Sequence, residues 1–126
     1  MKQKWETKNA PIPSKWIAQV SRDDNLGIAY ISGLIAGSEE NKTEMTAAQE
    51  TKIILENLKR IVEDMGLSMD NIIKTNIFIS DMKYFNEMDK VYREYFSHDN
   101  PPARQCVGAV IWGNYKLEIS SVAILK

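Results

Sequence analysis

One amphipathic segment, residues 46–66, constrains the fold of this chain more than any other feature of its sequence. Thr46 and Gln49 have the spacing of a capping box, in which two side chains satisfy backbone N–H groups at the start of a helix. Apolar side chains then recur at three- and four-residue steps and form a single stripe: Ile54, Leu58, Ile61, Val62 and Met65. Gly66 can supply the left-handed residue that ends a helix. We therefore expect one long helix that buries one of its faces.

The segments around this helix have the composition of β-strands. We predict strands at residues 4–8, 16–20, 27–35, 72–79, 103–111 and 116–125. Polar clusters predict a turn at residues 22–25 and a loop at residues 37–42. In segment 72–79 the alternation of side chains predicts that one face carries Ile73, Thr75, Ile77 and Ile79. The last two strands flank the turn Trp112-Gly113-Asn114-Tyr115, which favours an antiparallel hairpin.

A second, shorter helix is predicted to follow Asp81, whose side chain can cap it. Its apolar stripe runs through Phe85, Met88, Tyr92 and Tyr95 or Phe96, and residues 98–102 end it. The predicted order is β-β-β-α-β-α-β-β, an α/β (α+β) fold in which two helices cover only one face of the sheet. A chain of 126 residues is expected to form one domain, residues 1–126.

The open face of this sheet is expected to carry mixtures such as Lys74, Asn76 and Phe78. Such a face can be solvated, which is ordinary for an antiparallel sheet, or it can pack against other subunits. Three tryptophans and five tyrosines favour packing against subunits, because aromatic residues are enriched at interfaces.

Charge and composition argue against several classes of protein. Sixteen basic residues stand against seventeen acidic ones, so the basic excess typical of a nucleic-acid-binding protein is missing. Cys106 is the one cysteine and His98 the one histidine, which argues against a disulfide or a metal centre. No apolar run approaches the roughly 20 residues needed to span a bilayer, and residues 1–8 lack the apolar core of a signal peptide. We expect a cytoplasmic protein without membrane contact.

Several short motifs stand in a fixed order along nearly the whole chain. The most specific are Pro102-Ala103-Arg104-Gln105-Cys106-Val107 and, after it, Leu117-Glu118-Ile119. Before them stand Tyr30-Ile31-Ser32-Gly33, Gln49-Glu50-Thr51, Leu55-Glu56-Asn57-Leu58 and Phe85-Asn86-Glu87-Met88-Asp89-Lys90-Val91-Tyr92. In their order and spacing these motifs resemble the RidA/YjgF family of reactive intermediate deaminases.

The resemblance implies a chorismate-mutase-like subunit, with two helices on one face of a mixed sheet, that forms a homotrimer with clefts between neighbours. The best-known activity of the family is the hydrolysis of reactive 2-imino or enamine acids to 2-keto acids and ammonia. That activity uses neither a cofactor nor a metal. The ligand implied for this chain is therefore a small molecule that bears a carboxylate.

Arg104 and Glu118 are the expected catalytic residues. A guanidinium can bind a carboxylate through two parallel hydrogen bonds, and the resemblance gives Arg104 that role; a structural ion pair or a surface position is the alternative. Glu118 alternates with Leu117 and Ile119 and so faces away from the apolar side of its strand. The resemblance implies that its carboxylate holds or activates the attacking water, and a solvated strand charge is the alternative.

Further ligand-binding residues are expected along the cleft: Trp16, Ser32, Gly33, Asp89 and Cys106. Gly33 inside a strand allows a ligand or another backbone to come close, or it marks a bulge. Cys106 shares a face with Arg104 if the strand is regular. The family uses the backbone at that position, and a small buried thiol is the alternative to a reactive one.

The chain departs from the proven deaminases in the wall of the predicted cleft. Trp16 replaces the tyrosine of a Gly-Pro-Tyr-Ser-Gln stretch, Leu34 replaces a glutamine, and Asp89 replaces an asparagine. A negative charge at Asp89 would oppose a carboxylate ligand unless it is paired. A trimer that binds a small carboxylate or a partner without turnover is therefore the alternative to a deaminase. An RNA-acting protein, such as an endoribonuclease or a translation inhibitor, is a further alternative that the balanced charge disfavours.

Overall fold

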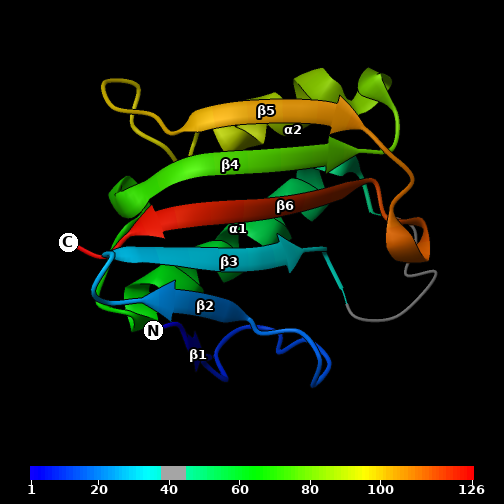
Figure 1. The fold of residues 1–126 in the computed structure, drawn as a ribbon. Coiled ribbons are helices and arrows are strands. Elements are labelled where there is room, and N and C mark those ends of the chain that lie inside the picture. The colour runs from blue at the N-terminus through cyan, green and yellow to red at the C-terminus, as the bar shows by residue number, and fades with distance from the viewer. Residues whose placement is uncertain (38–44) are drawn as a thin grey trace.

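The computed structural model describes residues 1–37 and 45–126, which form a six-stranded sheet with two helices against one of its faces (Figure 1). The strands are β1 Gln3–Trp5, β2 Val20–Asp23, β3 Ile28–Leu34, β4 Ile72–Ile79, β5 Ala103–Gly108 and β6 Leu117–Ile124. The helices are α1 Ala47–Asp64 and α2 Phe85–Tyr92, with short 3-10 turns at η1 Met69–Asn71, η2 Met82–Tyr84 and η3 Trp112–Asn114. The predicted element order and the one-sided helical layer are confirmed. Among the described residues, no helix has the length and apolarity to cross a membrane.

The strand order across the sheet, β1-β2-β3-β6-β4-β5, differs from the order along the chain. Strands β4 and β5 run parallel, as a connection through a helix requires, and the other described neighbours run antiparallel. The predicted hairpin of the last two strands is wrong, because β6 pairs with β3 and β4 and leaves β5 at the edge (Figure 1).

The turn at residues 112–115, on which that prediction was based, does form, but it connects two strands that do not pair with each other. Gly113 and Asn114 adopt left-handed backbone conformations, with φ of 72° and 62°. The segment carries the chain past the end of β4, where the Ser80 N–H donates to the Lys116 carbonyl at 2.9 Å. Strand β6 therefore enters the centre of the sheet, and the side chain of Leu117 is fully buried beneath the helical layer.

Helix α1 forms as the sequence predicts. Thr46 and Gln49 make the reciprocal capping box, and Gly66 has the expected positive φ of 82° just beyond the helix. The predicted apolar stripe is buried at Ile54, Leu58, Ile61 and Val62. Helix α2 differs at its start, because Asp81 caps η2 through the Lys83 N–H and α2 begins only at Phe85.

Residues 11–19 form a loop, so the strand predicted from residue 16 is wrong, and β2 begins only at Val20. The buried Gln19 explains the difference, because its side chain ties this loop to the preceding segment. Its Nε2 donates to the carbonyls of Thr7 at 3.1 Å and Pro11 at 2.9 Å, and its Oε1 accepts from the Thr7 N–H at 2.9 Å. The turn predicted at residues 22–25 falls at residues 24–27. The loop predicted at residues 37–42 lies, beyond Gly37, outside the described residues.

Strand β4 follows the predicted alternation from residue 75 onward but not at its start. The residues opposite Ile72 and Lys74 are neighbours in β6, so Ile73 is an extra residue in a β-bulge. The bulge turns Ile72 toward the core, where it is 3% exposed, and leaves Ile73 48% exposed. The prediction that Ile73 shares a face with Thr75, Ile77 and Ile79 is therefore wrong.

A buried carboxylate connects the start of α1 to the start of β6. Glu50 is 2% exposed, and its Oε1 accepts the backbone N–H groups of Lys116 at 2.9 Å and Leu117 at 3.3 Å. Burial raises the pKa of Glu50, although these hydrogen bonds and the charge of Lys116 act in the opposite direction. Glu50 thus fixes the segment directly before Glu118.

We predict that Glu50→Ala lowers the free energy of unfolding by about 1–3 kcal/mol, because buried N–H groups lose their acceptor. Glu50→Gln keeps an oxygen that can accept the same bonds, so its loss should be smaller. Urea unfolding of both variants at one protein concentration measures the difference. Equal losses in the two variants would contradict the hydrogen-bonding role.

The wild-type protein and Glu50→Gln should also differ in how their stability depends on pH. The pKa of Glu50 in the folded state lies above its ordinary value of 4.5, so folding favours the protonated carboxyl. This contribution is complete below that ordinary value and is lost as the pH rises through the raised pKa. The stability of the wild-type protein relative to Glu50→Gln should therefore fall from acid toward neutral pH. A relative stability that rises over this range would contradict the prediction.

Candidate functional site

Arg104 lies on the edge strand β5 and points toward the helical side of the sheet. It stands beside Thr75 of β4, which is buried under the helices and bonded to the hydroxyl of Tyr92 at 2.8 Å. The Arg104 Cζ lies 4.9 Å from the ring centroid of Tyr92 and 5.5 Å from that of Phe85. Helix α2 therefore provides an aromatic surface on which the guanidinium rests.

Asp89 of α2 pairs with Arg104. The Arg104 Nη1 lies 2.5 Å from Asp89 Oδ1, and the Nε of Arg93 lies 2.9 Å from Oδ2. Asp89 is 9% exposed; burial opposes its ionisation, but the hydrogen bond and charge of Arg104, with those of Arg93, lower its pKa. Asp89 is therefore a carboxylate at neutral pH. Within the described residues, the Nε and Nη2 of Arg104 make no hydrogen bond or ion pair.

A cavity of about 440 Å³ adjoins this ion pair. Its lining consists of Asp89, Tyr92, Arg93, Phe96, Ser97, His98, Pro101, Pro102 and Arg104. Arg104 is thus partly neutralised by its own chain, yet it faces a space large enough for a small organic acid. Its free Nε and Nη2 are the two donors that a bidentate carboxylate would use.

Cys106 stands two residues beyond Arg104, beside the buried Ile77 of β4. Its side chain is half-buried, and burial raises the pKa of the thiol although the positive charge of Arg104 opposes that change. The thiol is therefore protonated at neutral pH and unsuited to nucleophilic attack.

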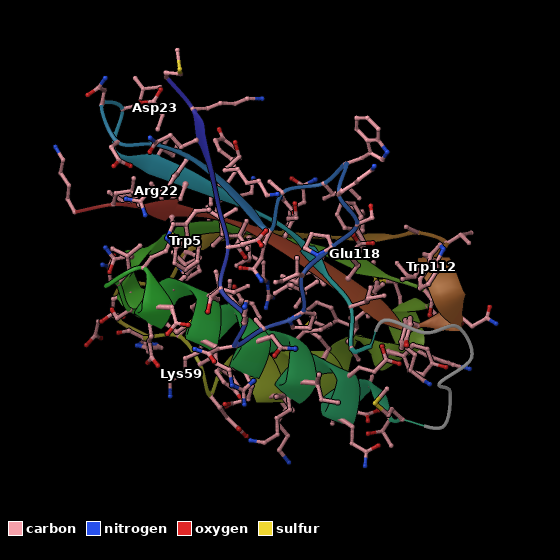
Figure 2. The ribbon with its side chains drawn as sticks, turned by 90° about the horizontal axis from the view of Figure 1, so that it is seen from below. Trp5, Arg22, Asp23, Lys59, Trp112 and Glu118 are labelled. Carbon is pink, nitrogen blue, oxygen red and sulfur yellow. The ribbon has the colours of Figure 1, made fainter. Side chains whose placement is uncertain are left out.

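Glu118 lies on the other face of the sheet. It stands beside Phe78 of β4, whose side chain points away from the helices. Its carboxylate lies directly over Gly33, so that a Cβ added to Gly33 would collide with Glu118 Oε2. Within residues 1–37 and 45–126, no hydrogen bond or ion pair engages the Glu118 carboxylate. Figure 2 shows Glu118 at the same end of the molecule as Trp112.

Ser32 and Gly33 interrupt the regular pairing of β3 with β6, where the register shifts between Ile31 and Leu34. The Ser32 hydroxyl donates to the Ala18 carbonyl at 2.6 Å, and the Ser32 N–H donates to the Gln19 carbonyl at 3.1 Å. Ser32 therefore holds the loop of residues 11–19 against the end of β3. The alternative reading of Gly33, a bulge in the strand, fits this register shift, whereas a contact of Gly33 with a ligand stays a prediction. The missing Cβ of Gly33 makes room for Glu118.

A second cavity, of about 520 Å³, lies between that loop and β3. Apolar side chains dominate its lining, and the residues are Pro11, Ile12, Pro13, Ser14, Ile17, Gln19, Ser32, Gly33, Leu34, Ile35, Gly37 and Trp112. Trp16 does not line it: its ring is 87% exposed, with the Nζ of Lys15 at 5.8 Å from the centroid. A role of Trp16 in a cleft therefore requires a neighbouring molecule.

The structure thus separates the predicted site residues into two groups. Arg104, Cys106 and Asp89 form the first group, on the helical side of the edge strand. Ser32, Gly33 and Glu118 form the second group, which borders the open face. Arg104 is level with the core-facing Thr75 and Glu118 is level with Phe78 on the open face, so within one chain the two side chains point to opposite faces of the sheet.

Several residues that line the two cavities were not expected from the sequence, among them Arg93 and Trp112. Arg93 follows Asp89 by four positions on α2, a helical spacing that could have predicted their ion pair. Trp112 reaches its cavity only because the preceding strand lies at the sheet edge, and no local signal indicates that arrangement. Among the described residues, no group of three His, Cys, Asp or Glu side chains could hold a metal ion.

Comparison with known proteins gives matches over nearly the whole chain. A family model described as Endoribonuclease L-PSP matches residues 7–125. The mitochondrial protein MMF1 of Saccharomyces cerevisiae is 35% identical over 122 residues, 95% of this chain and 82% of that protein. A RutC family protein of Buchnera aphidicola is 34% identical over 125 residues, 96% of each. The crystal structure of yeast Mmf1 has a TM-score of 0.88 at 32% identity and covers both chains completely. The structure of E. coli TdcF with bound serine has a TM-score of 0.82 at 29% identity, covering 97% of this chain and 98% of that one.

We predict that Gly33→Ala lowers the free energy of unfolding by about 1 kcal/mol, because the new methyl group displaces the Glu118 side chain. In a Glu118→Ala background the same change should be neutral or stabilising, since alanine loses less backbone entropy on folding than glycine. Urea unfolding of the four proteins, at one protein concentration, gives the coupling free energy. Coupling near zero would show that the two side chains do not compete for this space.

Proposed function

The chain belongs to the RidA/YjgF family, and we propose that it hydrolyses small 2-imino or enamine acids to 2-keto acids and ammonia in clefts between subunits. The observation that carries this proposal is the guanidinium of Arg104. It rests on aromatic rings, faces a cavity of about 440 Å³ and keeps two donors for a carboxylate. The serine bound to the similar TdcF supports a small carboxylate-bearing ligand.

Each residue of the proposed site has a chemical task. Arg104 holds the carboxylate and so places the C=N carbon within reach of a water molecule. Glu118 accepts a proton as the water oxygen bonds to that carbon, and the nitrogen is protonated in turn. The C–N bond of the tetrahedral adduct then breaks, and the departing ammonia takes up the hydroxyl proton to become ammonium while the carbonyl forms. This hydrolysis consumes only water, so we expect neither a cofactor nor a metal.

We further propose that the protein is a homotrimer whose clefts combine residues of two neighbouring subunits. The opposite orientation of Arg104 and Glu118 supports this arrangement, because a second copy can present the face that the first cannot. One subunit would supply Arg104, Asp89 and the backbone of Cys106. Its neighbour would supply Glu118 and a wall that includes Trp16, Ser32 and Gly33. Exposed apolar side chains on the open face also support subunit packing: Tyr30, Val107 and Ile124.

Binding without turnover is the second candidate function, and one specific observation favours it. Asp89 already occupies one donor of Arg104, which weakens the grip on an anionic ligand. The word endoribonuclease in the description of the family model raises RNA as a substrate. The sixteen basic and seventeen acidic residues of this chain provide no excess positive charge for phosphates, which disfavours that reading.

We treat residues 1–126 as one domain and propose the cytoplasm as its compartment. A single cysteine suits a reducing environment. The name of the yeast relative assigns that protein to the mitochondrion, so fractionation of cells that express this chain is the relevant measurement.

We predict that the wild-type protein accelerates the decay of freshly generated 2-iminobutanoate and that Arg104→Ala lowers kcat/KM by about 100-fold, the scale of a lost charged contact. Arg104→Lys keeps the positive charge but loses the two parallel donors, so its kcat/KM should lie between those of the wild-type protein and Arg104→Ala. Arg22→Ala removes an equivalent guanidinium, paired with Asp24 far from the site, and serves as the matched control. The absence of any acceleration by the wild-type protein would refute the enzymatic proposal and leave the binding role.

Mixed trimers test whether neighbours share a site. Arg104→Ala and Glu118→Ala homotrimers should both have very low activity, whereas trimers assembled from both chains should regain about a quarter of the wild-type activity. That fraction arises because half of the subunits keep Arg104 and, independently, half of their neighbours keep Glu118. Sites built within single subunits would show no recovery in the mixture.

A further inference from the structure

The side chains beside the cavity of about 440 Å³ include more charged groups than are needed to bind one carboxylate. Two cations, Arg93 and Arg104, flank one anion, Asp89, and each oxygen of Asp89 accepts from a different guanidinium. Asp89 is nearly buried, whereas the side chain of Arg93 is largely exposed. All three residues line the same cavity, so a molecule that enters it meets both signs of charge.

The arrangement affects different ligands in different ways. A plain anion, such as a 2-keto acid, gains the free Nε and Nη2 of Arg104 but is repelled by Asp89. A zwitterion with a cation next to its carboxylate can place the carboxylate on Arg104 and the cation toward Asp89. Asp89 thus opposes the first kind of ligand and attracts the second.

We propose that Asp89 is the residue that determines the charge class of the ligand, so that the cavity prefers zwitterionic 2-amino and 2-iminium acids to 2-keto acids of the same size. The inference rests on the proposed function, since it assumes that Arg104 holds the carboxylate. It also accounts for product release. A protonated 2-imino acid and water give a 2-keto acid anion and an ammonium ion, so the organic product lacks the positive charge that Asp89 attracts.

Arg93 has a defined part in this arrangement. It engages the Asp89 oxygen that Arg104 does not use and keeps the cluster at one net positive charge. Removing Arg93 would leave Asp89 with a single partner and make the cavity less favourable to anions. Removing the charge of Asp89 would have the opposite effect, and an asparagine in its place still offers an oxygen to Arg104.

Isothermal titration with 2-oxobutanoate and L-2-aminobutanoate, which share one carbon skeleton, tests the proposal. The wild-type protein should bind the amino acid about tenfold more tightly, the effect of one charge at close range in a partly hydrated site. Asp89→Asn should tighten 2-oxobutanoate about tenfold without tightening the amino acid, so that the preference disappears. Arg93→Gln should weaken 2-oxobutanoate. Asp24→Asn removes the same charge at the far side of the sheet, where Asp24 pairs with Arg22, and should leave both affinities unchanged.

The outcomes separate this inference from the proposed function. If Asp89→Asn leaves the ratio of the two affinities unchanged while Arg104→Ala abolishes both, the inference is overturned and the anchor stands. If neither compound binds to the wild-type protein or to Asp89→Asn, and no imine is hydrolysed, both are overturned. Thermal unfolding of each variant verifies that it is folded, and the opposite shifts expected for Asp89→Asn and Arg93→Gln cannot arise from a common loss of stability.

Discussion

Strand β6 lies between β3 and β4, and this placement determines the surroundings of both Arg104 and Glu118. It buries Leu117 under the helical layer and brings Glu118 over Gly33. Glycine has no Cβ, so it leaves space for the Glu118 carboxylate. It also excludes β5 from the interior of the sheet, so that Arg104 lies at an edge that no described strand covers. A hairpin of β5 and β6 would have closed that edge. The accessibility of the cation therefore follows from a pairing made elsewhere in the sheet.

The ion pair of Arg104 with Asp89 has two opposite effects on ligand binding. It fixes the guanidinium on the Tyr92 ring, so a ligand need not meet the entropic cost of ordering a long side chain. It also reduces the positive potential that a carboxylate feels. Arg93 decides the balance, because two cations against one anion leave a net attraction. Asp89 thus orients the anchor without abolishing its charge.

Local sequence patterns predicted the elements well but not their neighbours in space. The capping box at Thr46 and the stop at Gly66 involve residues close in the chain, and both formed as expected. The place of β6 was missed because a turn signal such as Gly113-Asn114 reports a change of direction and not which strand comes next. The bulge at Ile73 was missed for a related reason, since it depends on register with a strand about 50 residues away. At the site, the alternation of side chains correctly predicted that Glu118 faces away from the core. No local sequence signal showed that Glu118 and Arg104 point to opposite faces of the sheet.

The separation of those two residues explains how such a site can diverge. Each is supported by its own surroundings: Arg104 by the rings and the carboxylate of α2, and Glu118 by Gly33 and by the segment that Glu50 holds. Neither support involves the remaining side chains that line the cavities, such as Leu34, so these can change identity. A reaction that mainly requires a held substrate and a placed water can therefore persist while the walls change. The size and shape of the ligand are then set by those remaining wall residues, whose volume can change without moving Arg104 or Glu118.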